Sequence, residues 1–290
     1  MSSEKPEIFR LPHMEDGVGQ VQDNELAEDD APGSCKEYEE RYVAFIDILG
    51  FREIIKESAN SSAGASALGS IFNAMSLDFS GFSKDYSTRM NSDDDSHDLR
   101  VNTFSDFVVI SCKGTPTGLD VLCFVVWCVA RDWLSKGYLS RGGICSGKVI
   151  HVGGNNGNPG LVFGPAFISA YELEQEVADY PRVVLAKKVR KDLISCRSNI
   201  DVPSIAKLVK TCDDGPMYID LFAHLRSGGY EFLGKDFRGE ALQFNATLKS
   251  QVEHGADVPR WHRKTIWLVE KFNEAVRNTT YADLTIDRYA

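Results

Sequence analysis

The chain lacks any long hydrophobic run and has fewer basic than acidic residues. The closest candidate for a membrane span, residues 121–129, falls well short of the roughly 18 apolar residues that a spanning helix needs. Lys and Arg number 32 against 42 Asp and Glu, which gives a net charge of −10. Because nucleic acids bind clustered cations, this balance argues against a nucleic-acid partner, although a few local cations could hold a small anion. We expect neither a membrane nor a nucleic-acid partner.

Cysteine is present but lacks the spacing of a zinc or disulfide framework. The seven cysteines are an odd number, contain no CxxC pair and fall mainly in apolar runs. They are typical of reduced thiols. The chain also lacks the N-terminal apolar core of a signal peptide, so we expect a soluble, cytoplasmic protein.

The composition predicts a hydrophobic core of substantial size and a chain divided into a leader, a folded domain and a C-terminal extension. At 290 residues and 43% hydrophobic content the chain can bury a large core. Residues 1–35 are rich in Glu, Asp, Pro and Gly without periodicity, which predicts a disordered acidic leader. We expect one domain over residues 36–222 and a C-terminal helical extension, residues 223–290, packed on it.

One carboxylate interrupts the apolar strand-like run at residues 42–51. Asp47 needs a positive partner there, because an ionised carboxylate away from water must be paired or bound to a metal. Gly50 ends the run, and the spacing of Phe51 and the apolar residues after it predicts a helix. Asp47 could bind a metal or could cap that helix or pair with a lysine, and this segment alone leaves both open.

A second carboxylate lies in residues 99–112, two short strand-like runs that predict a hairpin with Asp106 at its tip. Turn tips often carry Asp for local hydrogen bonds, so this position has an ordinary explanation too. A metal site explains both aspartates together.

The remaining elements predict an α+β fold. Residues 80–98, with acidic residues at 93–95, are expected to be a solvated loop, and residues 139–151 a hairpin around a glycine turn. Helices are expected at 118–136, 166–178 and 187–194 and in the region 240–278, and strands at 181–186 and 217–222. This order is that of a ferredoxin-like or palm-type layer, an antiparallel-rich sheet covered by helices.

Four segments in this order resemble the class III nucleotide cyclases. They are FIDILGF at 45–51, FSD at 104–106, RGGICSG at 141–147 and the helix GPAFISAYELE at 164–174. Together with Pro-Arg at 181–182, these segments look like the pyrimidine cyclases of the bacterial anti-phage system Pycsar. The resemblance implies conversion of UTP to cyclic UMP, favoured by a narrow margin over conversion of CTP to cyclic CMP; either product is a second messenger that activates a downstream effector.

The resemblance also implies a two-metal site. Asp47, Asp106 and the backbone carbonyl of Ile48 would bind two Mn²⁺ or Mg²⁺ ions, which prefer oxygen ligands. The turn formed by Ile48, Leu49, Gly50 and Phe51 would bind the triphosphate through backbone N–H groups.

Three further residues complete the implied site. Arg141 is a candidate catalytic cation, and Arg182 is a candidate for substrate binding. Asn102 falls where purine cyclases contact the base, and its amide offers both a donor and an acceptor to a pyrimidine edge. An exposed strand Asn is an equally ordinary explanation.

One departure from the family leaves alternatives open. Many class III cyclases use an Asn and an Arg from the partner subunit in the transition state, and here Ile168 and Glu172 occupy these positions. Arg141, Arg182 or Lys148 could supply the cation instead. Alternatively, the chain is an inactive cyclase-like nucleotide-binding regulatory module, or a purine cyclase acting on ATP or GTP. By resemblance we expect a homodimer with its sites at the subunit interface.

Overall fold

The computed structural model describes residues 37–60, 64–90, 97–152, 160–199, 207–226 and 237–287. Residues 37–290 group into one compact unit. The acidic leader expected over residues 1–35 and the charged run at 93–95 lie outside the described residues. The domain boundary expected at residue 222 falls inside the compact unit and stays a prediction.

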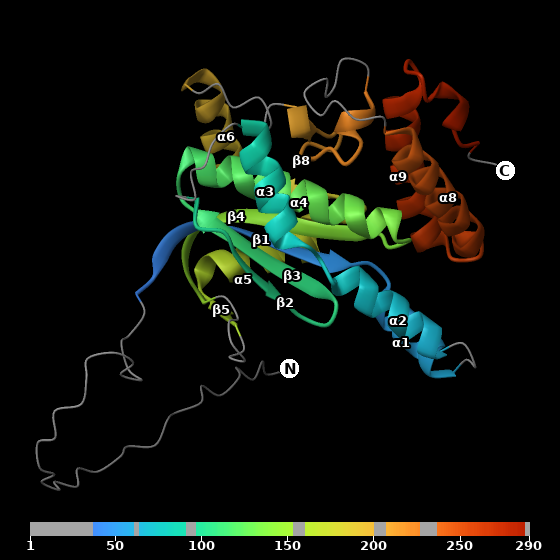
Figure 1. Cartoon of the computed structure of the whole chain (residues 1–290), viewed down its shortest axis with the longest axis horizontal. Coiled ribbons are helices and arrows are strands. Elements are labelled where there is room, and N and C mark those ends of the chain that lie inside the picture. Colours follow the sequence, from blue (N-terminus) through green and yellow to red (C-terminus); the bar gives the residue numbers. More distant parts are fainter. Residues whose placement is uncertain are drawn as a thin grey trace, which may run out of the picture. The chain divides into compact units, whose positions relative to one another are not determined.

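A mixed sheet forms the centre of the fold (Figure 1). The path of neighbouring strands is β2-β3-β1-β4-β6-β8-β7, and β5 pairs with β4 outside that path. Only the β4·β6 pair is parallel among these described strands. The strands are β1 Glu39–Ile48, β2 Arg100–Thr103, β3 Phe107–Lys113, β4 Ser140–Val152, β5 Leu161–Phe163, β6 Val183–Leu185, β7 Val209–Thr211 and β8 Met217–Ile219.

The order of elements confirms the predicted α+β, ferredoxin-like layer. Along the chain β1, helices, β2, β3, α4 and β4 follow one another, and in the sheet these strands lie in the order β2-β3-β1-β4. The helices are α1 Phe51–Asn60, α2 Gly64–Met75, α3 Phe79–Met90, α4 Pro116–Ser135, α5 Pro165–Val177, α6 Lys187–Asn199, α8 Arg238–Gly255 and α9 Pro259–Val276, with 3₁₀ turns η2 Ala223–Leu225 and η4 Ala282–Leu284.

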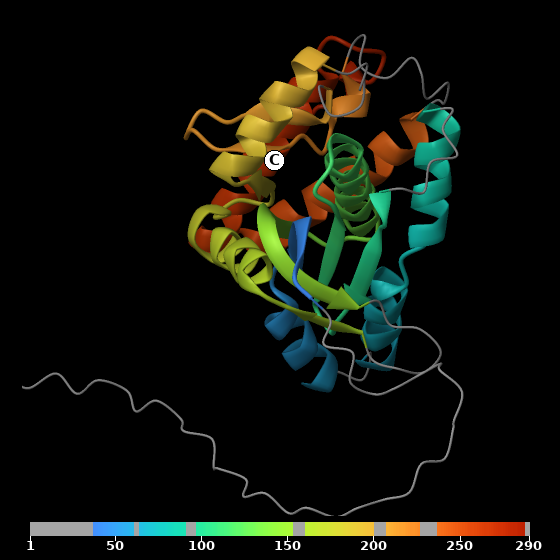
Figure 2. The same ribbon diagram turned by 90° about the vertical axis from the view of Figure 1, so that its left-hand side faces the viewer.

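Helices cover both faces of the sheet (Figures 1 and 2). Successive side chains of a strand point to opposite faces, and β1 divides accordingly. Ala44 and Ile46 pack in the cluster that contains α4, whereas Val43 and Phe45 pack in the cluster that contains α5. Asp47 therefore belongs to the α5 face.

The strand β4 runs unbroken over Ser140–Val152, so the hairpin predicted for residues 139–151 is wrong. The glycines at its start allow close packing rather than a turn. A Cβ at Gly142 would lie 2.3 Å from the carbonyl oxygen of Phe45, and one at Gly143 would lie 2.5 Å from that of Ala170. Sequence alone does not distinguish a glycine in a turn from one beneath a helix.

Two other predictions need correction. Most of the loop predicted for residues 80–98 is the helix α3, in which Tyr86 is buried and its hydroxyl donates to Asp120 Oδ2 at 2.7 Å. Because Ser and Gly weaken the local pattern, only the packing against α4 makes this helix recognisable. The helical region 240–278 divides into α8 and α9, and Pro259 begins the second helix.

The pair α8 and α9 builds a second core against the end of β1. Phe244, Leu248 and Phe272 are buried there together with Leu49 and Leu139, which flank the strand ends. None of the described helices combines the length and the apolar character needed to cross a membrane.

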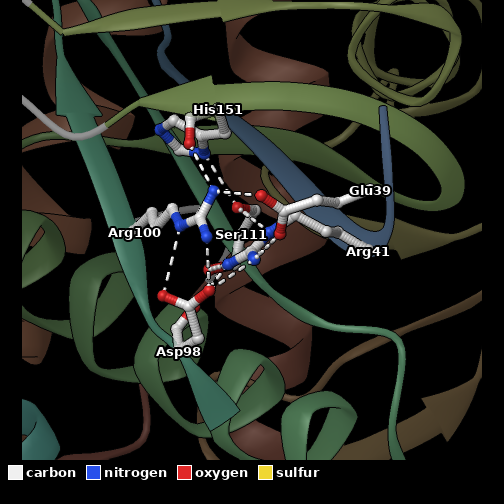
Figure 3. A network of polar contacts seen from close by, with 6 residues as sticks. All are labelled: Glu39, Arg41, Asp98, Arg100, Ser111 and His151. Carbon is white, nitrogen blue, oxygen red and sulfur yellow. Dashed lines mark hydrogen bonds and ion pairs between the residues drawn. The ribbon is translucent and has the colours of Figure 1, made fainter. Parts of the chain in front are cut away.

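A buried ionic network ties the strands β1 to β4 together at the opposite end of β1 (Figure 3). Arg41 is 1% exposed. Its guanidinium donates hydrogen bonds to Ser111 Oγ at 2.9 Å, Glu39 Oε2 at 2.8 Å and Asp98 Oδ2 at 2.8 Å. A buried charge needs this degree of pairing, because the energetic cost of removing it from water is large.

The same network holds the edge strand β2. Arg100 donates to Asp98 Oδ2 at 2.6 Å, to Glu39 Oε1 at 2.8 Å and to the carbonyl oxygen of His151 at 2.7 Å. The ring of His151, at the end of β4, contacts Ser111 Oγ through Nδ1 at 2.8 Å. Two arginines and two carboxylates thus balance each other at this end of the sheet.

Candidate functional site

Asp47 lies at the end of β1, where the strand leaves the sheet. It pairs with Phe107 of β3 on one side and with Arg141 of β4 on the other. Directly paired residues share a face, so Arg141 points to the α5 face as Asp47 does. The structure therefore brings these two predicted residues together.

Asp106 lies in the turn between β2 and β3, next to the end of β1. The backbone N–H of Ile48 donates to the carbonyl oxygen of Asp106 at 2.9 Å. Ser105 Oγ donates to Asp106 Oδ1 at 2.8 Å. The two aspartates, distant in sequence, thus come from neighbouring strand ends.

A third carboxylate, Glu174 of α5, completes the charged cluster. Its side chain is fully buried and forms an ion pair with Arg141 Nε. The sequence prediction missed this residue. A signal was present, because Glu174 follows Ala170 by four positions and so shares the inward, apolar face of the helix.

The charges around Asp47 favour its protonated form. Burial raises the pKa of Asp47 to about 7, and the charges of Glu174 and Asp106 add to this effect. The positive charge of Arg141 and the N–H of Ile48 oppose it. At neutral pH the positive charge of Arg141 therefore does not balance the carboxylates around Asp47.

Burial also raises the pKa of Glu174. Arg141, a hydrogen bond from Gln175 and the charge of Lys264 act in the opposite direction. Glu174 thus forms its ion pair with Arg141 of the sheet, and the charge of Lys264 on α9 also lowers its pKa.

The turn after β1 has the conformation that the sequence predicts. Gly50 has φ +76°, in the left-handed region, and its carbonyl oxygen accepts from the N–H of Glu53 at 3.0 Å and of Ile54 at 3.1 Å, which starts α1. A Cβ at Gly50 would lie 3.1 Å from the ring of Trp261 in α9. The first N–H groups of α1 thus follow Asp47 by only four residues.

Two other predicted site residues have structural partners. Arg182 is 4% exposed, donates to both carboxylate oxygens of Asp214 at 2.8 and 2.5 Å, and lies over the rings of Tyr180 and Trp267. These contacts would have to open before Arg182 could bind a substrate, and its role stays a prediction.

Asn102 lies under the start of β5 and is 5% exposed. In the amide orientation that satisfies both groups, it donates to the carbonyl of Val101 at 2.8 Å and accepts from the N–H of Leu161 at 3.1 Å. Reading a base would require it to exchange these partners. Lys148 pairs with Glu40, seven residues before Asp47 on β1, so it lies about 23 Å away along the strand.

The oxygen donors at the β1 end fit a hard divalent cation. Glu174 is occupied by Arg141, which leaves Asp47, Asp106 and the backbone carbonyl of Ile48. Asp47 in particular carries a charge that its surroundings disfavour, and a bound cation would compensate it. Over the described residues, no group of three or more His, Cys, Asp or Glu side chains is arranged to hold a metal ion. The candidate donors are thus two carboxylates and one backbone oxygen.

No family model and no curated protein matches the chain. Among solved structures, the adenylyl cyclase CyaB from P. aeruginosa is similar at 16% identity and a TM-score of 0.39, covering 63% of this chain and 93% of that one. The guanylate cyclase domain of RhGC from Catenaria anguillulae, in complex with GTP, is similar at 16% identity and a TM-score of 0.38, covering 63% and 96%. At this level of similarity, the function must be argued from the chain's own residues.

Proposed function

We propose that the chain is a metal-dependent nucleotide cyclase that converts UTP, or CTP, to the 3',5'-cyclic monophosphate and pyrophosphate. The observation that carries the proposal is the meeting of Asp47 and Asp106 beside the Gly50 turn, with an excess of negative charge. If Asp47 served only to cap the following helix, neither the second aspartate nor the uncompensated negative charge would be needed.

The chain's residues divide the chemistry among them. Asp47, Asp106 and the carbonyl of Ile48 would hold two Mn²⁺ or Mg²⁺ ions. When bound, such ions lower the pKa of the ribose 3'-hydroxyl and neutralise the departing pyrophosphate. The N–H groups at the start of α1 would donate hydrogen bonds to the phosphate oxygens, since Gly50 turns the chain from β1 directly into this helix end. Arg141 supplies a fixed positive charge beside Asp47 for the α-phosphate.

The pyrimidine preference and the biological role rest on the motif resemblance. RGGICSG at 141–147 and GPAFISAYELE at 164–174 look like the segments of the Pycsar cyclases. The cyclic product would act as a second messenger in anti-phage defence and reach its effector by diffusion. Asn102 is the candidate base reader.

A homodimer is part of the proposal. Apolar side chains remain exposed on the α5 face, among them Ile168 (53%) and Tyr171 (46%). Tyr171 makes an edge contact with Phe45, two residues before Asp47, so this apolar surface borders the site. A second copy that covers it would close the site over the substrate.

The test is to incubate the purified chain with Mn²⁺ and each of UTP, CTP, ATP and GTP and to identify the products by mass spectrometry. We expect cyclic UMP or cyclic CMP. Asp47→Ala and Asp106→Ala should lower turnover at least about a thousandfold while the circular dichroism spectrum stays unchanged, because each removes a metal ligand. The control is Glu253→Gln, an exposed carboxylate of α8.

Each other result has a defined meaning. A purine cyclic product would replace the pyrimidine assignment and retain the cyclase. Binding of a triphosphate without any cyclic product would instead favour the inactive regulatory module. Normal turnover in either Ala variant would refute the metal-ligand assignment.

A further inference from the structure

The indole ring of Trp261 joins the C-terminal helices to the turn after β1. A Cβ atom at Gly50 would lie 3.1 Å from Cζ3 and Cη2, on the benzene edge of the ring. A Cβ atom at Gly255, the last residue of α8, would lie 2.6 Å from Cδ1 on the opposite edge. Both distances are shorter than an ordinary van der Waals contact between carbon atoms. Glycine at each position therefore lets the ring span the space from α8 to the turn.

Hydrogen bonds fix the ring in this position. Trp261 Nε1 donates to Gln251 Oε1 at 3.1 Å, and Gln251 Nε2 donates to the carbonyl oxygen of Gly137 at 3.0 Å. Gly137 lies between α4 and β4, two residues before Leu139. The carbonyl oxygen of Leu139 in turn accepts from the N–H of Leu49 at 2.8 Å. The helix α8 thus reaches the turn by two routes, one through the ring and one through the connection between α4 and β4.

This turn carries the N–H groups that we expect to bind phosphate. The N–H of Leu49 is already bonded to Leu139, and the first bond of α1 runs from the N–H of Glu53 to the carbonyl oxygen of Gly50 at 3.0 Å. The N–H groups of residues 50–52 lie between these two bonds, at the helix start, where an anion can accept from them. Their direction depends on the backbone of Gly50, against which the ring of Trp261 packs.

We propose that Trp261 is a positioning residue of the nucleotide site, which holds the Gly50 turn in the conformation that presents the N–H groups of residues 50–52 to the polyphosphate. Gln251 supports it by fixing the ring. A glycine at φ +76° has no side chain of its own to restrict the turn, so packing from another element takes that role. The inference rests on the proposed cyclase function for its ligand, and it makes α8 and α9 part of the substrate site.

The experiment compares Trp261→Leu with Tyr281→Leu. Tyr281 is a matched control, because its ring packs on the same hydrophobic cluster of α8 and α9, but at the start of η4. Calorimetry measures the affinity for pyrophosphate with Mn²⁺, since every candidate substrate contains this group. We expect Trp261→Leu to weaken that affinity about fivefold and to lower kcat/KM about tenfold, because the donors of the turn lose their alignment. Gln251→Leu should cause a loss of about threefold in kcat/KM, and Tyr281→Leu should change neither quantity.

Amide hydrogen exchange separates positioning from folding. Trp261→Leu should speed exchange of residues 50–54 at least about tenfold, and Tyr281→Leu should leave it unchanged even if both variants melt at the same lower temperature. Wild-type pyrophosphate affinity in Trp261→Leu would overturn the proposal, and so would equal losses in both variants. A loss of affinity without faster exchange would overturn it too, since the ring would then act on the ligand and not on the turn.

Failure of the proposed function gives a different pattern. If the wild type yields no cyclic product from any of the four triphosphates, the cyclase assignment fails. Pyrophosphate affinity and amide exchange then decide the role of Trp261 by themselves. Changes in both that appear in Trp261→Leu and are missing in Tyr281→Leu would support it. A wild type that does not bind pyrophosphate with Mn²⁺ would contradict it.

Discussion

At the scale of single residues, the ionised form of Asp47 lowers the stability of the fold but is the form that metal binding requires. The residue ends a buried strand, and two further carboxylates lie close to it. Its ionised form is the one a metal would bind, and it is also the form that the metal-free fold disfavours. Such opposition is typical of functional sites, where a local cost is retained for chemistry.

Asp47→Asn should therefore stabilise the metal-free chain while it abolishes activity. Because the folded pKa of about 7 lies above the unfolded value of 3.8, ionisation of Asp47 lowers the free energy of unfolding as pH rises from about 4 to 7, and this contribution then levels off. At pH 8 the variant should gain roughly 1–3 kcal/mol in the free energy of unfolding, and the gain should shrink towards pH 4.

Chemical denaturation with and without Mn²⁺ measures this effect. Mn²⁺ should raise the stability of the wild type and leave Asp47→Asn unchanged. Glu253→Gln, the exposed control, should behave as the wild type does. A variant that is less stable than the wild type at pH 8 would contradict the account of the charge cluster.

At the scale of elements, the ionic network secures the end of the sheet that lies away from the site. Arg100 joins the short edge strand β2 to β1 and β4, and Arg41 joins β1 to β3. The hairpin that carries Asp106 is β2–β3, so the network fixes the far end of the element that holds the second aspartate.

This network predicts a loss of stability in acid. Burial lowers the pKa of His151 to about 4, and the charges of Arg41 and Arg100 add to this effect. Because the folded value lies below the unfolded value of 6.5, the contribution is complete above pH 6.5 and is lost as pH falls towards 4. The free energy of unfolding of the wild type minus that of His151→Gln, both from urea titrations, should fall by about 2–3 kcal/mol over that interval, because the opposite contribution of Asp47 is common to both proteins.

His151→Gln cannot gain a proton and should lose most of this slope between pH 6.5 and 4. The free energy of unfolding should fall again below about pH 4, in the wild type and in His151→Gln alike. Burial alone would raise the pKa of Asp98, but hydrogen bonds from Arg100 and Arg41 lower it to about 2. An unchanged slope in the His151 variant would contradict the assignment to this histidine.

At the scale of the whole molecule, the α5 face of the sheet is the surface that we expect a second copy of the chain to cover, because it exposes apolar side chains. A row of rings runs from Phe104 through Phe107 to Phe45, with centroids 4.4 and 4.8 Å apart, and Phe104 is 39% exposed. Phe163 of β5 is also 41% exposed. Aromatic and aliphatic side chains around a charged site are typical of an interface between copies.

Ile168→Asp should weaken association and activity together, because it introduces a charge into the proposed interface. Ile194→Asp is the matched control, since Ile194 of α6 is 56% exposed, close to the 53% of Ile168, but lies on a helix that packs on the α4 face. Sedimentation should give a dimer for the wild type and for Ile194→Asp, and a dissociation constant at least about tenfold weaker for Ile168→Asp. A monomeric wild type with full turnover would exclude a shared site.

The sequence by itself determined most of the elements, though not the helix α3 or the unbroken strand β4, and it identified the two aspartates. A carboxylate in a buried strand and a second one at a hairpin tip are local anomalies, visible because burial disfavours ionised groups. The strand, turn and helix around Asp47 and Gly50 are likewise fixed by local pattern and by the left-handed freedom of glycine.

Only the tertiary structure decided which charges share the site. Glu174 comes from an element distant in sequence from Arg141, and no local pattern pairs the two residues. Gly142 and Gly143 have the local pattern of a turn. They are needed instead because the backbones of β1 and α5 approach β4 too closely for a Cβ atom, and those elements lie in other segments of the chain. Local propensity depends on near neighbours, whereas electrostatic partners and close approaches depend on packing between distant segments, which the folded chain alone defines.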